Sequence, residues 1–403
     1  MELFWLEHKK LWRKKIVKIC VLLCFVYYVI FGSILSFQWF CFGSSDDYTS
    51  AFGNNFDGYT VIKDSQEYAL SFGGELTDET LQQIVSDYQQ MEADGMEEEL
   101  EKTDWQIVNS WLGTLYPELR DTSNYKTMIS YVDPDKLTGF YERRQQVLDE
   151  FLEISGQVGA EKEFLHQIER KVEKPFHYEW VEGWSTLLGS TVADQGVVMA
   201  LFLGIVLSSL FAGEWHDNTS TLVLTTRNGW GKIALAKILT GLAFTVELFA
   251  LLAVSNVISQ LFFMGTAGWD MPIQNIKLIA VAPMNMLQAE IYEYAFVLLG
   301  AIGFAGIVMF ISAAVKNNVL TLLLSLAVVY GPMMIAEYLP YEMQKALDLI
   351  PLVGSSTDIF RTNTFRIFGK LIWSPYLLIT IPVLIGILCM PFAIKSWSRR
   401  MKA

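Results

Sequence analysis

The sequence predicts an α-helical polytopic membrane protein with six transmembrane helices and a mainly helical extracellular domain that contains a little β structure. Of the 403 residues, 52% are hydrophobic, which is more than a single soluble domain normally carries. The charges are also segregated: residues 44–192 hold 30 Asp and Glu against 11 Lys and Arg, whereas the rest of the chain holds 13 against 19. These two observations indicate an acidic aqueous domain inserted into a slightly basic membrane body.

Residues 1–18 are expected to form a cytoplasmic helix that lies in the membrane interface. At helical spacing, most of the basic side chains of this segment fall away from one apolar side. That side carries Phe4, Trp5, Leu11 and Trp12. We therefore expect membrane lipids among the partners of this helix.

Residues 19–43 are predicted to be the first transmembrane helix. They contain 25 uncharged residues, enough to cross a hydrocarbon core of about 30 Å. The segment is too long for a signal-peptide core and lacks a small-residue cleavage site, so we expect it to be retained. Cys20 and Cys24 have no His or carboxylate beside them, which favours apolar packing over metal binding.

Residues 44–192 are predicted to be an extracellular acidic domain, because they contain no run long enough to span a membrane. Hydrophobic periodicity and capping residues predict two short strands and four helices. The expected strands are 59–62 and 68–72, and the expected helices begin after Thr77, span 105–115, run from Asp133-Pro134 to Ile154, and run from Ala160 to Glu173. The acidity has two interpretations, attraction of a cationic substrate or simple solubility.

Residues 193–403 are predicted to be a membrane domain of five helices. The expected spans are about 194–213, 233–263, 289–315, 319–336 and 371–394. Six crossings place both termini in the cytoplasm, and the excess of Lys and Arg at the predicted inner ends favours this orientation. Gly300, Gly303 and Gly306 give the fourth helix a small-residue face for close helix packing. We expect a multi-pass protein of a bacterial plasma membrane.

A polar loop, residues 214–232, joins the second and third predicted spans on the cytoplasmic side. A short amphipathic piece from Thr219 to Thr226 is followed by the helix-stopping pair Asn228-Gly229. Because its Thr and Val residues disfavour an isolated helix, we expect a partner protein to hold it.

The residues of this loop resemble the coupling loop of type-2 ABC transporter permeases. The resemblance is carried by Glu214, Asn218-Thr219, Leu222-Val223-Leu224, Thr226, Arg227, Gly229 and Lys232, with Asn218 where the family usually has Gly. It covers about residues 193–403. It implies a coupling helix that docks on separate ATPase subunits, with Glu214, Thr219, Leu222 and Arg227 as contacts, and a second permease subunit forming a homo- or heterodimer.

We therefore expect the membrane-spanning subunit of an ABC exporter, without enzymatic activity of its own. The chain lacks a G-x-x-x-x-G-K-[ST] phosphate loop, so we expect no cofactor in it and ATP bound by the partner ATPase. We expect no nucleic-acid partner. The sequence leaves the cargo open among peptide, lipid, antibiotic and ion.

Two alternatives stay open. A mechanotransmitting ABC permease would use the same ATPase to act on the outer domain without transport, although such proteins usually have four membrane helices. A membrane-anchored receptor or hydrolase would have its site in residues 44–192, where no catalytic motif is found.

Glu247 is a carboxylate well inside the third predicted span. A carboxylate there is costly unless it is paired or faces water. It is therefore predicted either to line a transport path or to anchor a packing network.

Overall fold

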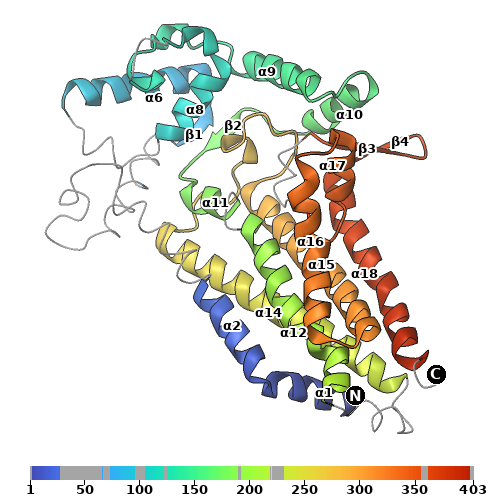
Figure 1. The fold of residues 1–403 in the computed structure, drawn as a ribbon. Helices are drawn as coiled ribbons and strands as arrows, with labels where there is room; N and C mark the ends of the chain where they lie inside the picture. Colours follow the sequence, from blue (N-terminus) through green and yellow to red (C-terminus); the bar gives the residue numbers. More distant parts are fainter. Residues whose placement is uncertain are drawn as a thin grey trace, which may run out of the picture.

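The computed structural model describes residues 2–27, 66, 73–95, 105–121, 126–188, 192–217, 219, 231–354 and 362–399. Figure 1 shows three levels: short N-terminal helices at the base, a bundle of long helices, and a cap of shorter helices over the far end of the bundle. We call the described part of residues 73–188 the cap domain. The start of α1 and the end of α18 both lie at the base.

Within the described chain, five helices are long and apolar enough to cross a membrane. They are α12 (Val192–His216), α14 (Lys232–Met264), α15 (Met286–Val315), α16 (Asn318–Ala336) and α18 (Ser374–Arg399). They agree with the five spans predicted for residues 193–403. The first predicted span begins within α2 (Lys15–Tyr27) and then continues outside the described residues, so the sixth crossing stays a prediction.

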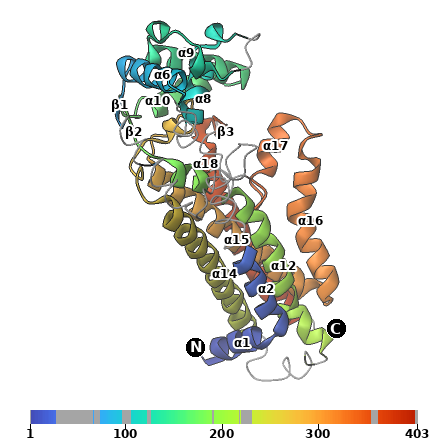
Figure 2. The same cartoon turned by 90° about the vertical axis from the view of Figure 1, so that its left-hand side faces the viewer.

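Helix α15 lies at the centre of the bundle, where it packs against α12, α14, α16 and α18. Its closest approach is to α18, because a Cβ on Gly303 would come within 2.3 Å of the Pro382 carbonyl oxygen, and a Cβ on Gly306 within 2.4 Å of that of Gly386. The predicted small-residue face is thus a packing face. Helix α16 lies on the opposite side of the bundle from α14 (Figure 2).

The N-terminal segment forms two helices rather than one interfacial helix over residues 1–18. Helix α1 (Glu2–Arg13) packs across the base of α14, and α2 then runs up beside α12 and α14. Leu11 is buried, whereas Trp5 and Leu6 are more than 60% exposed. The apolar residues of α1 are therefore only partly buried against the rest of the protein, and the others are exposed on its surface.

The cap domain is mostly helical, as its sequence pattern predicts, and its small sheet is formed by two strands that were not predicted. In it, β1 (Gly74–Leu76) pairs antiparallel with β2 (Phe176–Tyr178), Gly74 opposite Tyr178. Its helices are α6 (Asp78–Ala93), α8 (Trp105–Leu115), α9 (Phe140–Ile154), α10 (Ala160–Glu169) and α11 (Glu182–Thr186), with single 3-10 turns at Pro117–Leu119, Met128–Ser130 and Pro134–Lys136. The strands predicted at 59–62 and 68–72 lie outside the described residues.

Two predicted helix boundaries in the cap domain are wrong. Asp133 and Pro134 open only a 3-10 turn, and α9 begins six residues later because Gly139 takes a left-handed conformation with φ 72°. Helix α10 ends at Glu169 rather than at Glu173, where the chain tightens as the Val172 N–H donates to the Glu169 carbonyl oxygen. The start of α6 is confirmed, since the Thr77 hydroxyl accepts from the Thr80 N–H at 3.2 Å.

The cap domain is fastened to the connection between α14 and α15, residues 265–285, which contains a 3-10 turn at Ile273–Asn275. Both contribute to one hydrophobic core. The Trp111 indole N–H donates to the Asn275 carbonyl oxygen at 3.0 Å, and the buried Arg144 donates to the carbonyl oxygens of Leu278 and Ala280 at 2.7 and 3.1 Å. The cap domain is therefore attached rigidly to the α14–α15 pair.

A second connection, between α16 and α18, also reaches the cap domain. It contains α17 (Tyr341–Leu347) and a hairpin in which β3 (Thr364–Ile367) pairs antiparallel with β4 (Lys370–Trp373). The Thr364 hydroxyl donates to the Gln157 side-chain oxygen at 2.9 Å, and Arg366 forms an ion pair with Glu161.

Candidate functional site

A cluster of four charged side chains lies where α1 crosses the base of α12 and α14. We call Glu7, Lys10, Glu214 and Lys237 the base cluster. Glu214 Oε1 accepts from Lys10 Nζ at 2.5 Å and from Lys237 Nζ at 2.8 Å, and Lys237 also donates to Glu7 Oε2 at 2.8 Å. The cluster thus joins α1 to two helices that lie far from it in the sequence, with 204 residues between Lys10 and Glu214.

The centre of the base cluster is removed from water. The side chains of Lys237 and Glu214 are 2% and 3% exposed. Charges buried to this extent are tolerated only when they are paired. Glu214 also lies in the last turn of α12, where the partial negative charge of the helix end disfavours a carboxylate. Lys10 and Lys237 offset that effect.

The lysines of α1 and the following bend respond differently to this environment. Burial by itself would lower the pKa of Lys10, but the hydrogen bond and charge of Glu214 outweigh it and raise that pKa. Burial and the neighbouring charges of Lys237 and Lys10 lower the pKa of Lys14, whose ammonium group donates to the Ser209 hydroxyl at 2.9 Å. Lys10 is therefore held firmly in its charged form by the cluster.

The base cluster ties together the two ends of the predicted coupling loop. Glu214 is the first residue of the loop and Lys237 follows its end, and the Thr219 hydroxyl donates to the Glu214 carboxylate as well. The structure thus brings together two of the four predicted ATPase contacts, Glu214 and Thr219. Leu222 and Arg227 lie outside the described residues.

The placement of Glu214 differs from its predicted one. The resemblance implies that Glu214 contacts the ATPase, whereas it lies in the last turn of α12 and is buried against lysines of its own chain. A direct contact with a partner does not fit this placement. Lys10 and Lys237 lie 204 and 23 residues away from Glu214, so no local pattern could have revealed the cluster.

Glu247 does not point into the helix bundle. Its carboxylate lies 3.1 Å from His8 Nε2 and accepts from the Trp12 indole N–H at 3.0 Å, and its side chain is 42% exposed. It therefore fastens α1 to α14. Of the two predicted roles for Glu247, this arrangement fits the packing anchor.

Two buried carboxylates in a spanning helix were missed by the sequence analysis. Glu290 and Glu293 lie in the first two turns of α15 and are 4% and 0% exposed. Their spacing of three residues in an otherwise apolar stretch is the signal that could have found them.

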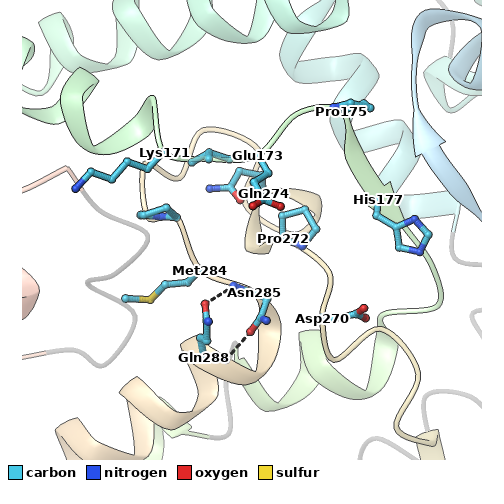
Figure 3. Close-up of a pocket in the computed structure, with 12 residues that line it drawn as sticks. Lys171, Glu173, Pro175, His177, Asp270, Pro272, Gln274, Met284, Asn285 and Gln288 are labelled. Atoms are coloured by element: carbon cyan, nitrogen blue, oxygen red, sulfur yellow. Dashed lines mark hydrogen bonds between the residues drawn. The ribbon is translucent and has the colours of Figure 1, made fainter.

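A cavity of about 340 Å³ lies between the end of the cap domain and the connection that leads to α15 (Figure 3). Lys171, Glu173, His177 and Asp270 give it charges of both signs. At one edge Asn285 caps α15: its side-chain oxygen accepts from the Gln288 N–H at 2.8 Å, and the Gln288 side chain accepts from the Asn285 N–H at 3.2 Å. This lining suits a small polar ligand without selecting one charge. In the described part of the chain, no group of three or more His, Cys, Asp or Glu residues is arranged to hold a metal ion.

No protein-family model matches this chain, and no curated protein or solved structure matches it either.

Proposed function

We propose that this chain is the membrane-spanning permease subunit of an ABC transporter that exports a substrate with the help of separate ATPase subunits. The observation that carries the proposal is the base cluster, which holds together the two ends of the loop whose sequence resembles a coupling helix. A loop that receives force from a partner needs firmly fixed ends. The base cluster supplies them through paired charges, of which the central pair, Glu214 and Lys237, is buried.

The role of Glu214 in this proposal is to position the loop. Because its carboxylate joins α1, α12 and α14, a displacement of the loop would move these three helices together. Leu222 and Arg227 then remain as the candidates for direct contact with the ATPase, together with the partly exposed Thr219.

The proposal includes the other expected partners. A second permease subunit would complete the transporter, and the exposed Trp5 and Leu6 of α1 suit contact with membrane lipids. The chain would be a multi-pass protein of a bacterial plasma membrane, with its base, both termini and the loop in the cytoplasm and the cap domain outside.

The test is co-purification of the tagged chain with a cassette ATPase from membranes of its own host, with ATP hydrolysis as the readout. Leu222→Asp would place an unpaired charge in the docking interface, so we expect loss of ATPase association and of stimulated hydrolysis, with normal membrane insertion. Ile154→Asp, at a position of the cap domain that is 86% exposed, is the matched control and should change neither. Full stimulation by the Leu222→Asp variant would contradict the docking role.

A mechanotransmitting permease is the second candidate. It is favoured by the attachment of the cap domain to the α14–α15 connection through Trp111 and Arg144, because such an attachment would carry motion outward without a transported cargo. ATP-dependent substrate transport in proteoliposomes separates the two functions: transport supports the exporter, and its absence from an active complex supports mechanotransmission.

A further inference from the structure

Four polar side chains are buried between α14 and α15 at the end of the bundle that faces the cap domain. They are Asn256 and Gln260 of α14 and Glu290 and Glu293 of α15, and we call them the amide-carboxylate cluster. Their exposed fractions are 0%, 1%, 4% and 0%. Polar side chains buried at such a depth of a spanning helix are rare and usually functional.

The register of the two helices brings these side chains together. The Asn256 amide donates to the Tyr294 hydroxyl at 3.0 Å, which fixes one point of contact between the antiparallel helices. One turn closer to the cap domain, Gln260 follows Asn256 on α14 and Glu290 precedes Tyr294 on α15, so both lie on the same contact face. Glu293 lies three residues from Glu290, and the two carboxyl groups are close enough for their charges to interact.

The polar atoms of this cluster are not satisfied by the described residues. Both carboxylate oxygens of Glu293, both amide atoms of Gln260 and the side-chain oxygen of Asn256 are buried without a hydrogen bond. The Glu290 carboxyl group is also buried, with the Tyr294 hydroxyl beside it. Native structures leave few such groups unpaired, and each costs about 1–3 kcal/mol or more when it is charged. The cluster therefore needs a compensating group that the side chains themselves do not supply.

The chemistry of these buried atoms indicates which kind of compensating group the cluster would bind. The cluster holds six buried side-chain oxygens, four from carboxyl groups and two from amides, and one unpaired nitrogen, that of the Gln260 amide. Oxygen-only sites with two carboxylates suit hard cations such as Ca²⁺ and Na⁺ rather than soft metals.

We propose that Asn256, Gln260, Glu290 and Glu293 form an enclosed site for a hard cation, Ca²⁺ or Na⁺, which joins α14 to α15 beneath the cap domain. Ca²⁺ would neutralise both carboxylates, whereas Na⁺ would neutralise one and leave the other to a proton. The proposal does not rest on the permease function, because the site lies within one chain and needs no ATPase.

The test uses the full-length chain in detergent micelles after treatment with EDTA, in choline chloride buffer at fixed pH and ionic strength. The unfolding temperature is followed by tryptophan fluorescence while CaCl₂, NaCl or further choline chloride is added. A ligand that binds only the folded state stabilises it by mass action, so we expect a saturable rise of a few degrees at about a hundredfold excess over Kd. Ca²⁺ or Na⁺ should produce this rise and choline should not.

Substitutions test whether the cation-dependent rise in unfolding temperature comes from this site. Glu290→Gln combined with Glu293→Gln keeps the side-chain shapes but removes both charges, and should abolish the response. Gln260→Leu should weaken apparent cation affinity about tenfold, the effect of losing one ligand worth about 1.4 kcal/mol. Glu247→Gln, which removes a carboxylate of α14 that is bound to His8, should respond like the wild type.

Two results would overturn the proposal. The first is a wild-type protein with no specific response to either cation, which would mean that protons alone neutralise the carboxylates. The second is an undiminished response of the double glutamine variant, which would assign the effect to the acidic surface of the cap domain.

Discussion

The two ends of α14 bury charge in opposite ways. At the base, Lys237 and Glu214 are buried and pair at 2.8 Å, with Glu7 and Lys10 completing the set. At the cap end, Glu290 and Glu293 are equally buried but have no cationic side chain paired with them in the described chain. Burial is therefore the same at both ends, and the pairing differs. A paired cluster fixes helices to one another, whereas an unpaired one is incomplete until it takes up a positive charge.

The largest expected effect comes from breaking the paired end. Lys237→Met should destabilise the protein by about 3–5 kcal/mol, because it leaves the buried Glu214 carboxylate with too little positive charge around it. The measurement is the change in unfolding free energy in detergent. Lys232→Met, at an exposed position of the same helix, is the control and should stay within about 0.5 kcal/mol.

A double variant measures the interaction between Glu214 and Lys237 apart from the cost of losing either charge alone. Glu214→Gln combined with Lys237→Met removes one charge of each sign, so its cost should be smaller than the sum of the two single costs. Additive costs would show that the two residues do not interact in solution.

The cap domain contains a further buried ion pair, Arg144 with Glu169. Arg144 is 0% exposed and donates to Glu169 at 2.6 Å as well as to the two carbonyl oxygens of the α14–α15 connection. Arg144→Lys keeps the charge but cannot reproduce this planar set of contacts, and we expect a loss of about 2–3 kcal/mol. Hydrogen exchange should show faster opening of the cap domain. Arg170→Lys, at an exposed position, should leave exchange unchanged.

Substitution at the unpaired end sharpens the comparison. In cation-free buffer, Glu293→Gln should change stability by no more than about 1 kcal/mol, or raise it, because the Glu293 carboxyl group has no ion-pair partner to lose among the described residues. Glu214→Gln should be clearly destabilising under the same conditions. Equal losses for the two variants would contradict the distinction between paired and unpaired ends.

The smallest effect is expected at Glu247. Its side chain is 42% exposed, so water screens its interaction with His8, and Glu247→Gln should cost less than about 1 kcal/mol. A double-mutant cycle with His8→Gln measures the coupling, which should diminish in high salt. A large coupling energy that does not change with salt would show that Glu247 and His8 are shielded from water in solution, contrary to the exposure of Glu247 in the structure.

The sequence predicts the features that depend on neighbouring residues. Long apolar runs predict the five described spans, and Thr77 predicts the start of α6 because its capping hydrogen bond is local. The boundary at Asp133-Pro134 is wrong because a capping pair can also begin a single turn, and the left-handed Gly139 decides where α9 starts.

The candidate sites are less predictable because their members are distant in sequence. The resemblance points to Glu214 and Thr219 but not to Lys10, whose position depends on the bend between α1 and α2. Hydropathy does not single out Glu290 and Glu293, because the mean hydropathy of α15 stays high despite them. They also lie at the edge of the predicted span. Only the packing of α14 against α15 shows that both are buried.

Helix α14 has 33 residues, which corresponds to a length of about 50 Å, well beyond the 30 Å or so of a hydrocarbon core. It runs without a break from Lys237 at the base to Met264, whose carbonyl oxygen accepts from the Trp180 indole N–H of the cap domain at 3.1 Å. Such a rod acts as a lever: a tilt of about 5° around its base would move its far end by about 4 Å. A small rotation of α14 at the base would thus displace the cap domain by more than a covalent bond length. The helix has no break between the two ends that would absorb this movement.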